Sequence, residues 1–270
     1  MNESLRWIKA DEPLPDASTA LTDPPGLVAA GLDLSTDRLD EAYRKGIFPW
    51  FSDGQPVLWW SPDPRMVLYT DELHLSHSLK KRLRQIKRIQ TSALQPTITI
   101  TTDLAFDAVL NGCAQRGTDA AQDTWITDVM QQAYRQWHRL GAVHSIEVWS
   151  NQTLVGGLYG VCLGRMFFGE SMFSRCPDTS KIAMVYLVRF LKANGVSLID
   201  CQMQTDHLAR LGAREIKRTT FLTHVRRAVT EQALPWPRGR LTALGQIEQD
   251  HQVVTEYAHL GQPIGYDYLS

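Results

Sequence analysis

The stretch HSIEVWSNQTLVGGLYGVCLGRMFFGE, residues 144–170, decides the fold of this chain. Two runs rich in aliphatic and aromatic side chains, 144–150 and 153–164, are separated by the polar pair Asn151 and Gln152. Apolar runs on either side of a two-residue polar turn are typical of a β-hairpin. Residues 165–170 supply a third apolar run. We therefore expect an antiparallel meander here.

Helices and further strands are expected on both sides of the meander. Strands are predicted at 96–101 and 196–202. Capping residues and apolar periodicity predict helices over 35–46 (Ser35 as N-cap), 76–88 (Ser76), 103–113 (Asp103), 127–140 (Thr127), 178–193, 205–211 and 219–230. This order describes an α+β fold with a mixed, largely antiparallel sheet.

The composition indicates a folded protein of the cytoplasm. Of 270 residues, 43 % are hydrophobic, and 28 Lys and Arg against 29 Asp and Glu leave a net charge of −1. Affinity for a polyanion therefore requires local clustering of cations. The four cysteines form no C-x-x-C pair, which argues against a zinc site or a disulfide framework. The N-terminus has no signal-peptide core, and no apolar run suggests a membrane span.

The chain divides by local composition. Residues 46–68, GIFPWFSDGQPVLWWSPDPRMVL, contain four prolines and three tryptophans and indicate a rigid aromatic connector, not a long helix or a central strand. The expected domains are a small N-terminal domain with this connector, 1–64, a larger domain, 65–234, and a C-terminal extension, 235–270, whose role the sequence does not indicate.

A basic helix is expected at residues 76–88. Six cations fall within residues 80–88, and no acidic residue occurs between Glu72 and Asp103. Such a helix can lie along nucleic-acid phosphates and give a salt-sensitive affinity with little base reading. The alternative is an ordinary solvated helix face.

Polar groups stand out in two otherwise apolar strands. Glu170 lies between Phe167 and Phe173, although a strand end can also direct a carboxylate to water. Asp200 and Gln202 are two apart in a predicted strand and are expected on one face of it. A carboxylate there can fix the direction of the Gln202 amide. A pair with structural hydrogen bonds only is the alternative.

GNAT-type acyltransferases share this order of elements. They usually hold the pyrophosphate of coenzyme A with a Q/R-x-x-G-x-G/A turn before a helix, where backbone N–H groups face the phosphates. The corresponding stretch here, SRCPDTSK at residues 174–181, contains no glycine. This argues against coenzyme A and leaves a different activated acyl donor open.

Several motifs together carry a specific resemblance. GIFPWF, LWWSPDPR, TWIT, HSIEVW, GGLYGV, FGESMFSR, and LIDCQ followed by DHLARLGA occur in this order over about residues 25–235. In combination they resemble the leucyl/phenylalanyl-tRNA–protein transferases of bacteria. The resemblance implies transfer of Leu or Phe, with Met as a further donor, from tRNA to the N-terminal amine of proteins that begin with Arg or Lys. This addition creates a signal for degradation. The resemblance also implies a small N-terminal domain joined to a GNAT-like acyltransferase domain, which we expect to act as a monomer without a cofactor or metal.

The resemblance also implies roles for individual residues. Asp200, Gln202 and Glu170 would be catalytic: Gln202 accepts a hydrogen bond from the attacking amine, Asp200 supports the emerging charge, and Glu170 positions the donor. In a rival account, the terminal ribose or a water carries the proton, and Asp200 and Gln202 only orient the substrates. The apolar pocket for the aminoacyl side chain would consist of Leu158, Phe167, Met172, Met184, Leu187 and Ile199. Three of these depart from the commonest family pattern, with Leu158 for Met, Met184 for Leu and Leu187 for Phe.

Binding of tRNA is expected at two places. Trp50 and Trp125 would stack on the terminal adenine, as aromatic side chains do with unpaired bases. The cations of the basic helix, among them Lys80, Lys81, Arg82 and Arg84, would contact acceptor-stem phosphates. Trp59 and Trp60 are interpreted as core anchors between the domains and His207 as structural.

Recognition of the acceptor protein is not assigned by the sequence. Glu147 and Asp206 are the candidates for contacting an incoming Arg or Lys. Three other functions remain open: a coenzyme A-dependent GNAT acyltransferase, a related leucyl transferase acting on N-terminal Asp or Glu, and an RNA-binding protein without catalysis.

Overall fold

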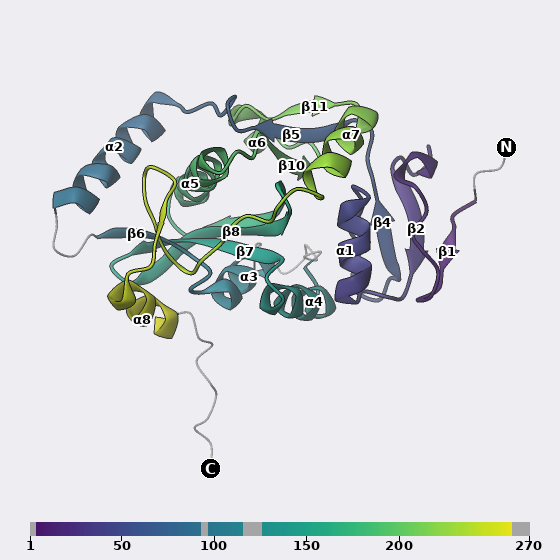
Figure 1. Ribbon diagram of the computed structural model, residues 1–270, viewed down its shortest axis with the longest axis horizontal. Coiled ribbons are helices and arrows are strands. Elements are labelled where there is room, and N and C mark those ends of the chain that lie inside the picture. The colour runs from purple at the N-terminus through teal and green to yellow at the C-terminus, as the bar shows by residue number, and fades with distance from the viewer. Residues whose placement is uncertain (1–3, 93–96, 116–125, 261–270) are drawn as a thin grey trace, which may run out of the picture.

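The computed structural model describes residues 4–92, 97–115 and 126–260, which form two β-sheets and the helices packed on them (Figure 1). A four-stranded sheet comes from the N-terminal part of the chain and lies beside helix α1 (Thr36–Arg44). A nine-stranded sheet comes from the rest. One hydrophobic core contains side chains from both sheets, including Trp59 and Tyr159, so the two sheets share their interior.

The small sheet has the spatial order β1 (Trp7–Ile8), β2 (Leu27–Gly31), β4 (Val57–Trp60), β3 (Phe48–Pro49), and a 3₁₀ turn (Ala17–Thr19) precedes β2. Only β1 and β2 are parallel. Because β4 pairs on both sides, the prediction that residues 46–68 contain no central strand is wrong. The prolines are tolerated because Pro49 lies in edge strand β3 and Pro56 precedes β4, so neither removes an interior hydrogen bond.

The large sheet has the spatial order β11 (Arg214–Ile216), β5 (Arg65–Tyr69), β10 (Leu198–Gln202), β9 (Met166–Ser174), β8 (Thr153–Leu163), β7 (Val143–Ser150), β6 (Ile98–Thr102), β12 (Gly239–Leu241), β13 (Ile247–Glu248). Every neighbouring pair is antiparallel except β9 and β10. The prediction of a mixed, largely antiparallel sheet is confirmed. In the β7–β8 turn, Asn151 and Gln152 have φ of 45° and 66°, which the twist of a two-residue hairpin favours.

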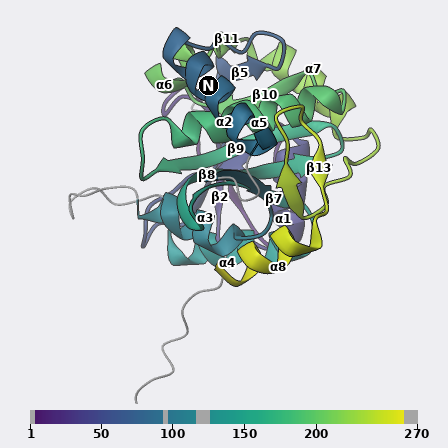
Figure 2. The same ribbon diagram turned by 90° about the vertical axis from the view of Figure 1, so that its left-hand side faces the viewer.

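Helices cover both faces of the meander β7–β8–β9. The helices that follow α1 are α2 (His77–Ser92), α3 (Phe106–Ala114), α4 (Asp128–Arg139), α5 (Thr179–Ala193), α6 (Asp206–Arg210), α7 (Arg218–Ala228) and α8 (His251–Leu260). Helix α5 packs on one face, and α3 and α4 pack on the other (Figures 1 and 2). The apolar side chains between α5 and the sheet form a second core.

Helix starts test the capping predictions one by one. The hydroxyls of Ser35, Ser76 and Thr127 accept hydrogen bonds from N–H groups three residues later, which confirms these N-caps. Asp103 is not an N-cap, because α3 begins only at Phe106. The backbone of Asp103 is left-handed, with φ of 54°, and its buried carboxylate accepts the Ser145 N–H at 2.7 Å.

Residues 239–248, which follow α7, extend the large sheet. Gly239 and Arg240 of β12 pair with Thr102 and Thr101 of β6, and β13 pairs with the outer edge of β12. Helix α8 places Tyr257 against Trp149, with 5.0 Å between ring centroids (Figure 2 shows β13 and α8 along one flank). The segment is therefore part of the packed structure.

Candidate active site

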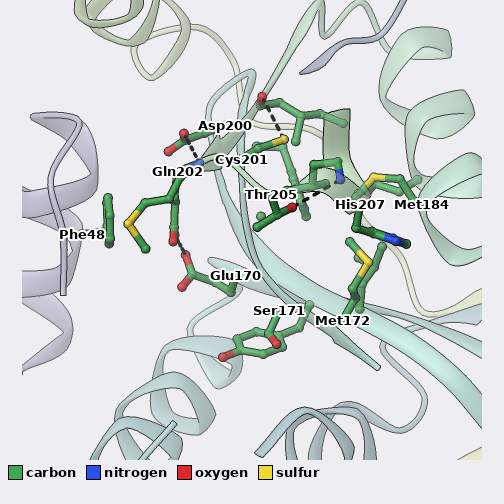
Figure 3. A pocket seen from close by; sticks show the side chains of 18 of the residues that line it. Phe48, Glu170, Ser171, Met172, Met184, Asp200, Cys201, Gln202, Thr205 and His207 are labelled. Carbon is green, nitrogen blue, oxygen red and sulfur yellow. Dashed lines mark hydrogen bonds between the residues drawn. The ribbon is translucent and has the colours of Figure 1, made fainter. Parts of the chain in front are cut away.

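Two β-bulges on neighbouring strands shape the site. Between β8 and β9, Tyr159 faces Ser171 and Gly160 faces Gly169, so Glu170 is the extra residue of the bulge. Between β10 and β5, the register shifts between Asp200 and Gln202, and Gln202 has φ of 61°. Bulges re-aim side chains that a regular strand would direct elsewhere. Here they bring Gln202 Nε2 to 3.1 Å from Glu170 Oε1 (Figure 3).

Glu170 is held by neutral hydrogen-bond donors. Tyr43 donates from Oη to Glu170 Oε1 at 2.6 Å, and Tyr134 donates from Oη to Glu170 Oε2 at 3.0 Å. Burial raises the pKa of Glu170 to about 7, against the opposing effect of these hydrogen bonds, and the charge of Asp200 raises it further. The carboxylate thus has several neutral donors, and among the residues that the structure describes no cation forms an ion pair with it.

The number of protons around Glu170 matters. The hydroxyl oxygens of Tyr43 and Tyr134 lie 2.6 Å apart, so three oxygen–oxygen contacts join the two tyrosines and the glutamate. While Glu170 is ionised, the two hydroxyl protons must serve all three contacts. A protonated carboxyl adds a third proton, and each contact then has a donor. This geometry favours proton uptake at Glu170.

Asp200 has the opposite environment. Its carboxylate is fully buried and accepts hydrogen bonds from Arg65 Nε at 2.8 Å and Arg65 Nη2 at 2.6 Å. The guanidinium of Arg65 lies between the rings of Phe48 and Phe221, 4.7 and 4.5 Å from their centroids. A paired, bidentate arrangement of this kind fixes both groups firmly.

The predicted contact between Asp200 and the Gln202 side chain is not the one observed. Asp200 Oδ1 accepts the backbone N–H of Gln202 at 2.9 Å, and the side-chain amide donates to Glu170 instead. The reason is the bulge, which breaks the two-residue period on which the prediction depended. Glu170 therefore orients the amide, and Asp200 fixes the backbone that carries it.

A cavity of about 290 Å³ opens beside these groups. The three polar residues Glu170, Asp200 and Gln202 line it, and so do all six apolar residues predicted for the pocket: Leu158, Phe167, Met172, Met184, Leu187 and Ile199. Figure 3 shows Phe48 from the N-terminal part of the chain on the opposite side of the cavity from Met184 and His207. The cavity thus combines an apolar lobe under α5 with a polar wall at the two bulges.

The residues predicted to contact RNA lie at separate places in the structure. Trp50 lines the cavity, is 39 % exposed, and lies with its ring centroid 5.7 Å from that of Trp60. Trp59 is fully buried in the core, and Trp60 is partly buried. Trp125 lies outside the described residues. On α2, Lys80, Lys81 and Arg84 are exposed, while Arg82 Nη1 is 3.8 Å from Asp178 Oδ2 of α5.

The two acidic candidates for acceptor recognition have different outcomes. Glu147 is fully buried and accepts hydrogen bonds from the hydroxyls of Ser145 and Thr101, each at 2.5 Å, so it does not face an incoming protein. Asp206 is exposed at the start of α6. His207, interpreted as structural, lines the cavity.

Sequence reasoning did not find Arg65, Tyr43 and Tyr134. Tyr43 and Tyr134 lie on the buried faces of α1 and α4, which periodicity predicts, but the pattern does not say which acid they meet. The available signal was the isolated acid itself, because a buried carboxylate requires donors from neighbouring elements. Within the described ranges, no cluster of His, Cys, Asp or Glu is suited to a metal ion.

None of the helices that the structure describes is long and apolar enough to cross a membrane.

Two solved structures show weak likenesses to this chain. The C-terminal domain (DUF2156) of a putative lysylphosphatidylglycerol synthetase from Agrobacterium fabrum is 13 % identical, with a TM-score of 0.35, over 76 % of this chain and 61 % of that chain. L-PGS from Bacillus licheniformis is 12 % identical, with a TM-score of 0.33, over 67 % and 56 %. At these scores neither likeness supports an inference.

Sequence comparison is decisive. Residues 67–226 match the leucyl/phenylalanyl-tRNA protein transferase family, and residues 32–63 match the N-terminal domain of the same family. The transferase of Bordetella petrii is 55 % identical to this chain, over 90 % of this chain and 95 % of that protein. The transferase of Methylibium petroleiphilum is 54 % identical, over 84 % of each chain. The transferase of Laribacter hongkongensis is 49 % identical over 86 % of this chain. This chain therefore belongs to the leucyl/phenylalanyl-tRNA–protein transferase family of aminoacyltransferases.

Proposed function

We propose that this chain transfers Leu or Phe from tRNA to the N-terminal amine of proteins that begin with Arg or Lys, and so marks them for degradation. One observation carries the proposal beyond family membership: the six apolar residues expected around the aminoacyl side chain converge on one cavity with Glu170, Asp200 and Gln202. The Arg or Lys acceptor rests on the family resemblance. No acidic side chain of the cavity is assigned to it.

We propose that the side chain of the transferred amino acid binds in the apolar lobe of the cavity. Leu158, Phe167 and Ile199 come from three adjacent strands, and Met184 and Leu187 cover them from α5. An apolar aliphatic or aromatic side chain fits such a lobe, and one methylene is worth only about 1–3 kcal/mol of discrimination. We therefore propose Leu and Phe as donors and Met as a weaker one.

The chemistry requires one proton to leave. The acceptor ammonium must lose a proton before its nitrogen attacks the ester carbonyl; the new C–N bond forms, the C–O bond to the ribose breaks, and the nitrogen's second proton goes to the ribose oxygen. We assign the first proton to Glu170. An α-ammonium has a pKa of about 8, and the pKa of Glu170 is about 7, so the transfer is only slightly uphill. A carboxylate at its ordinary pKa would be a far weaker base here.

Asp200 and Gln202 serve orientation. The Gln202 Nε2 donates to Glu170, so its Oε1 is free to accept from the incoming amine. Asp200, anchored by Arg65, holds the Gln202 backbone in its left-handed conformation. The rival account, in which the terminal ribose or a water takes the proton, predicts that Glu170 affects binding alone.

We propose that tRNA binds along the basic helix and at the mouth of the cavity. Lys80, Lys81 and Arg84 of α2 are exposed and suited to acceptor-stem phosphates, with Arg82 beside them. Trp50 at the cavity can stack on the terminal adenine. Trp125 stays a prediction for the same role.

Domain organisation, assembly and location belong to the same proposal. We propose a GNAT-like catalytic domain at 65–234, a small N-terminal domain at 1–64, a C-terminal extension at 235–270, and a monomer that works in the cytoplasm, where aminoacyl-tRNA is available.

Coenzyme A is disfavoured at the start of α5, because the N–H of Ser180 already donates to Ser174 Oγ at 2.9 Å. Transfer to N-terminal Asp or Glu and RNA binding without catalysis are the competing functions.

A transfer assay tests the proposal. Purified protein is mixed with radiolabelled Leu-, Phe- or Met-tRNA and with peptides that begin with Arg, Lys, Asp or Ala, and label in the peptide is counted. Transfer to Arg and Lys peptides alone is the expected result. Transfer to Asp would overturn the acceptor assignment, and no transfer from a tRNA-binding sample would favour the noncatalytic function, with acetyl-coenzyme A as the next donor to test.

A further inference from the structure

A stack of aromatic rings lies behind the donor pocket. The indole of Trp236 stacks on Phe167, with 5.8 Å between ring centroids and 19° between planes, and on His144, with 4.3 Å and 10°. The ring of Phe190 meets it edge-on at 4.6 Å. Trp236 thus fills the space between the cavity wall and the strand that carries His144.

Phe167 is the cavity residue that meets this stack. It is fully buried, it lines the cavity, and a Cβ on Gly160 would overlap its ring, so Phe167 lies close against the backbone of β8. Trp236 does not line the cavity. The stacking contact with Phe167 is therefore a route by which Trp236 can influence a bound substrate.

The segment that carries Trp236 is anchored at several points. The Thr102 hydroxyl donates to the Pro237 carbonyl at 2.9 Å, and Arg238 Nε donates to the Asp103 carbonyl at 2.9 Å. Gly239 then pairs with Thr102 of β6. The backbone next to Trp236 is therefore held in place, and the indole has little freedom to withdraw.

The far side of the stack is fixed as well. The His144 ring makes hydrogen bonds with Asp103 Oδ2 at 2.7 Å, through Nδ1, and with the Gly141 carbonyl at 3.1 Å, through Nε2. A ring with both nitrogens engaged is a rigid surface. Phe167 is therefore supported through Trp236 by a fixed part of the sheet.

We propose that Trp236 is a positioning residue for donor selectivity: by holding Phe167 in place, it limits the size of the aminoacyl side chain that the pocket accepts. This rests on the proposed function. It gives the C-terminal segment, beyond the residues 67–226 matched to the family, a part in substrate choice.

The physical consequence is specific. Trp236→Ala leaves a space behind Phe167, and a close-packed wall relaxes into such a space. The pocket then becomes deeper, which favours Phe over Leu as donor. We expect the ratio of kcat/KM for Phe-tRNA to that for Leu-tRNA to rise about 10-fold, the order of change that one methylene makes in an apolar pocket.

The experiment is a competition between Phe-tRNA and Leu-tRNA in one tube with an Arg-peptide acceptor. Both products come from the same active molecules, so their ratio does not change if a variant is partly unfolded. Trp236→Phe is the conservative variant: among the described residues the indole N–H has no hydrogen-bond partner, so Phe loses none and should keep the ratio near that of the wild type.

Tyr257→Ala is the matched control. It removes another ring that docks the C-terminal segment on the sheet, through Trp149 and the Thr99 hydroxyl, and none of these three residues lines the cavity. A shift toward Phe in Trp236→Ala alone supports the inference. An unchanged ratio, a shift toward Leu, or an equal shift in Tyr257→Ala overturns it. Failure of the wild type to transfer either amino acid would instead reject the proposed function.

Discussion

The substitution Glu170→Gln tests whether Glu170 accepts a proton in the reaction or is a buried acid without a catalytic role. Burial raises the pKa of Glu170 from 4.5 to about 7. The folded state therefore binds the proton more tightly than the unfolded state does, so the stabilisation is full below the unfolded pKa and is lost as pH rises through about 7. At about 1.4 kcal/mol per pH unit, the ionised form costs roughly 3 kcal/mol of unfolding free energy at alkaline pH, as an upper bound.

Glu147 provides an internal control. Burial raises its pKa to about 7 as well, against hydrogen bonds from Ser145 and Thr101, but it does not line the cavity. Both Glu170→Gln and Glu147→Gln should therefore lose less stability than the wild type as pH rises from 4.5 to about 7, the unfolded and folded pKa values of these glutamates. Urea unfolding over this range measures the difference.

Only one of the two variants should change the pH dependence of transfer. If Glu170 takes the proton, the wild-type rate falls as pH falls through about 7, because the protonated carboxyl can accept no further proton. A limb at about 7 should persist in Glu147→Gln. In Glu170→Gln the limb should move to the pKa of the acceptor amine, about 8, and the rate should drop about 100-fold or more, the usual contribution of a general base. A limb that stays at about 7 in Glu170→Gln would refute the assignment and favour the ribose or a water.

Three further perturbations test the remaining roles. Asp200→Asn leaves Arg65 buried without its counter-charge and should cost about 3–5 kcal/mol of unfolding free energy; turnover should fall with an unchanged tRNA Kd, and an equal loss of tRNA binding would contradict the orienting role. Lys80→Ala combined with Arg84→Ala should weaken tRNA binding and lower the salt slope by about 1.5, measured by filter binding; an unchanged slope would make α2 a solvated helix face. Leu187→Phe should narrow the donor pocket and reduce transfer of Phe relative to Leu by about 10-fold in competition; an unchanged ratio would place the donor elsewhere.

Local sequence signals predicted the elements that local physics controls. The meander follows from two apolar runs and a polar pair, and three helix starts follow from hydroxyl caps. Asp103 shows the limit of such reasoning. Its carboxylate is used by Ser145 of a distant strand, which outcompetes the local cap. Strand β12 was missed for the same reason, since its pairing with β6 depends on residues that are far away in sequence.

The sequence predicted which residues form the site but not which of them contact one another. The resemblance supplied the cavity residues, and all nine of them line one cavity. Period-two reasoning failed at Asp200 and Gln202, because a bulge is not visible in the pattern. Tyr43 and Tyr134 are 91 residues apart, so only the fold brings both hydroxyls to Glu170.

Asp200 and Glu170 lie in opposite electrostatic environments, and this difference explains why the site needs both acids. Asp200 meets a permanent cation, Arg65, in a bidentate pair, so its charge is fixed and it can serve as a rigid support for the Gln202 backbone. Glu170 accepts its hydrogen bonds from donors that are all neutral in the described part of the chain, and these stabilise its charge incompletely. Carboxylates whose environments differ in this way take different roles. An isolated acid among phenylalanines is then not an anomaly of the sequence, because the apolar setting is what lets Glu170 exchange a proton near neutral pH.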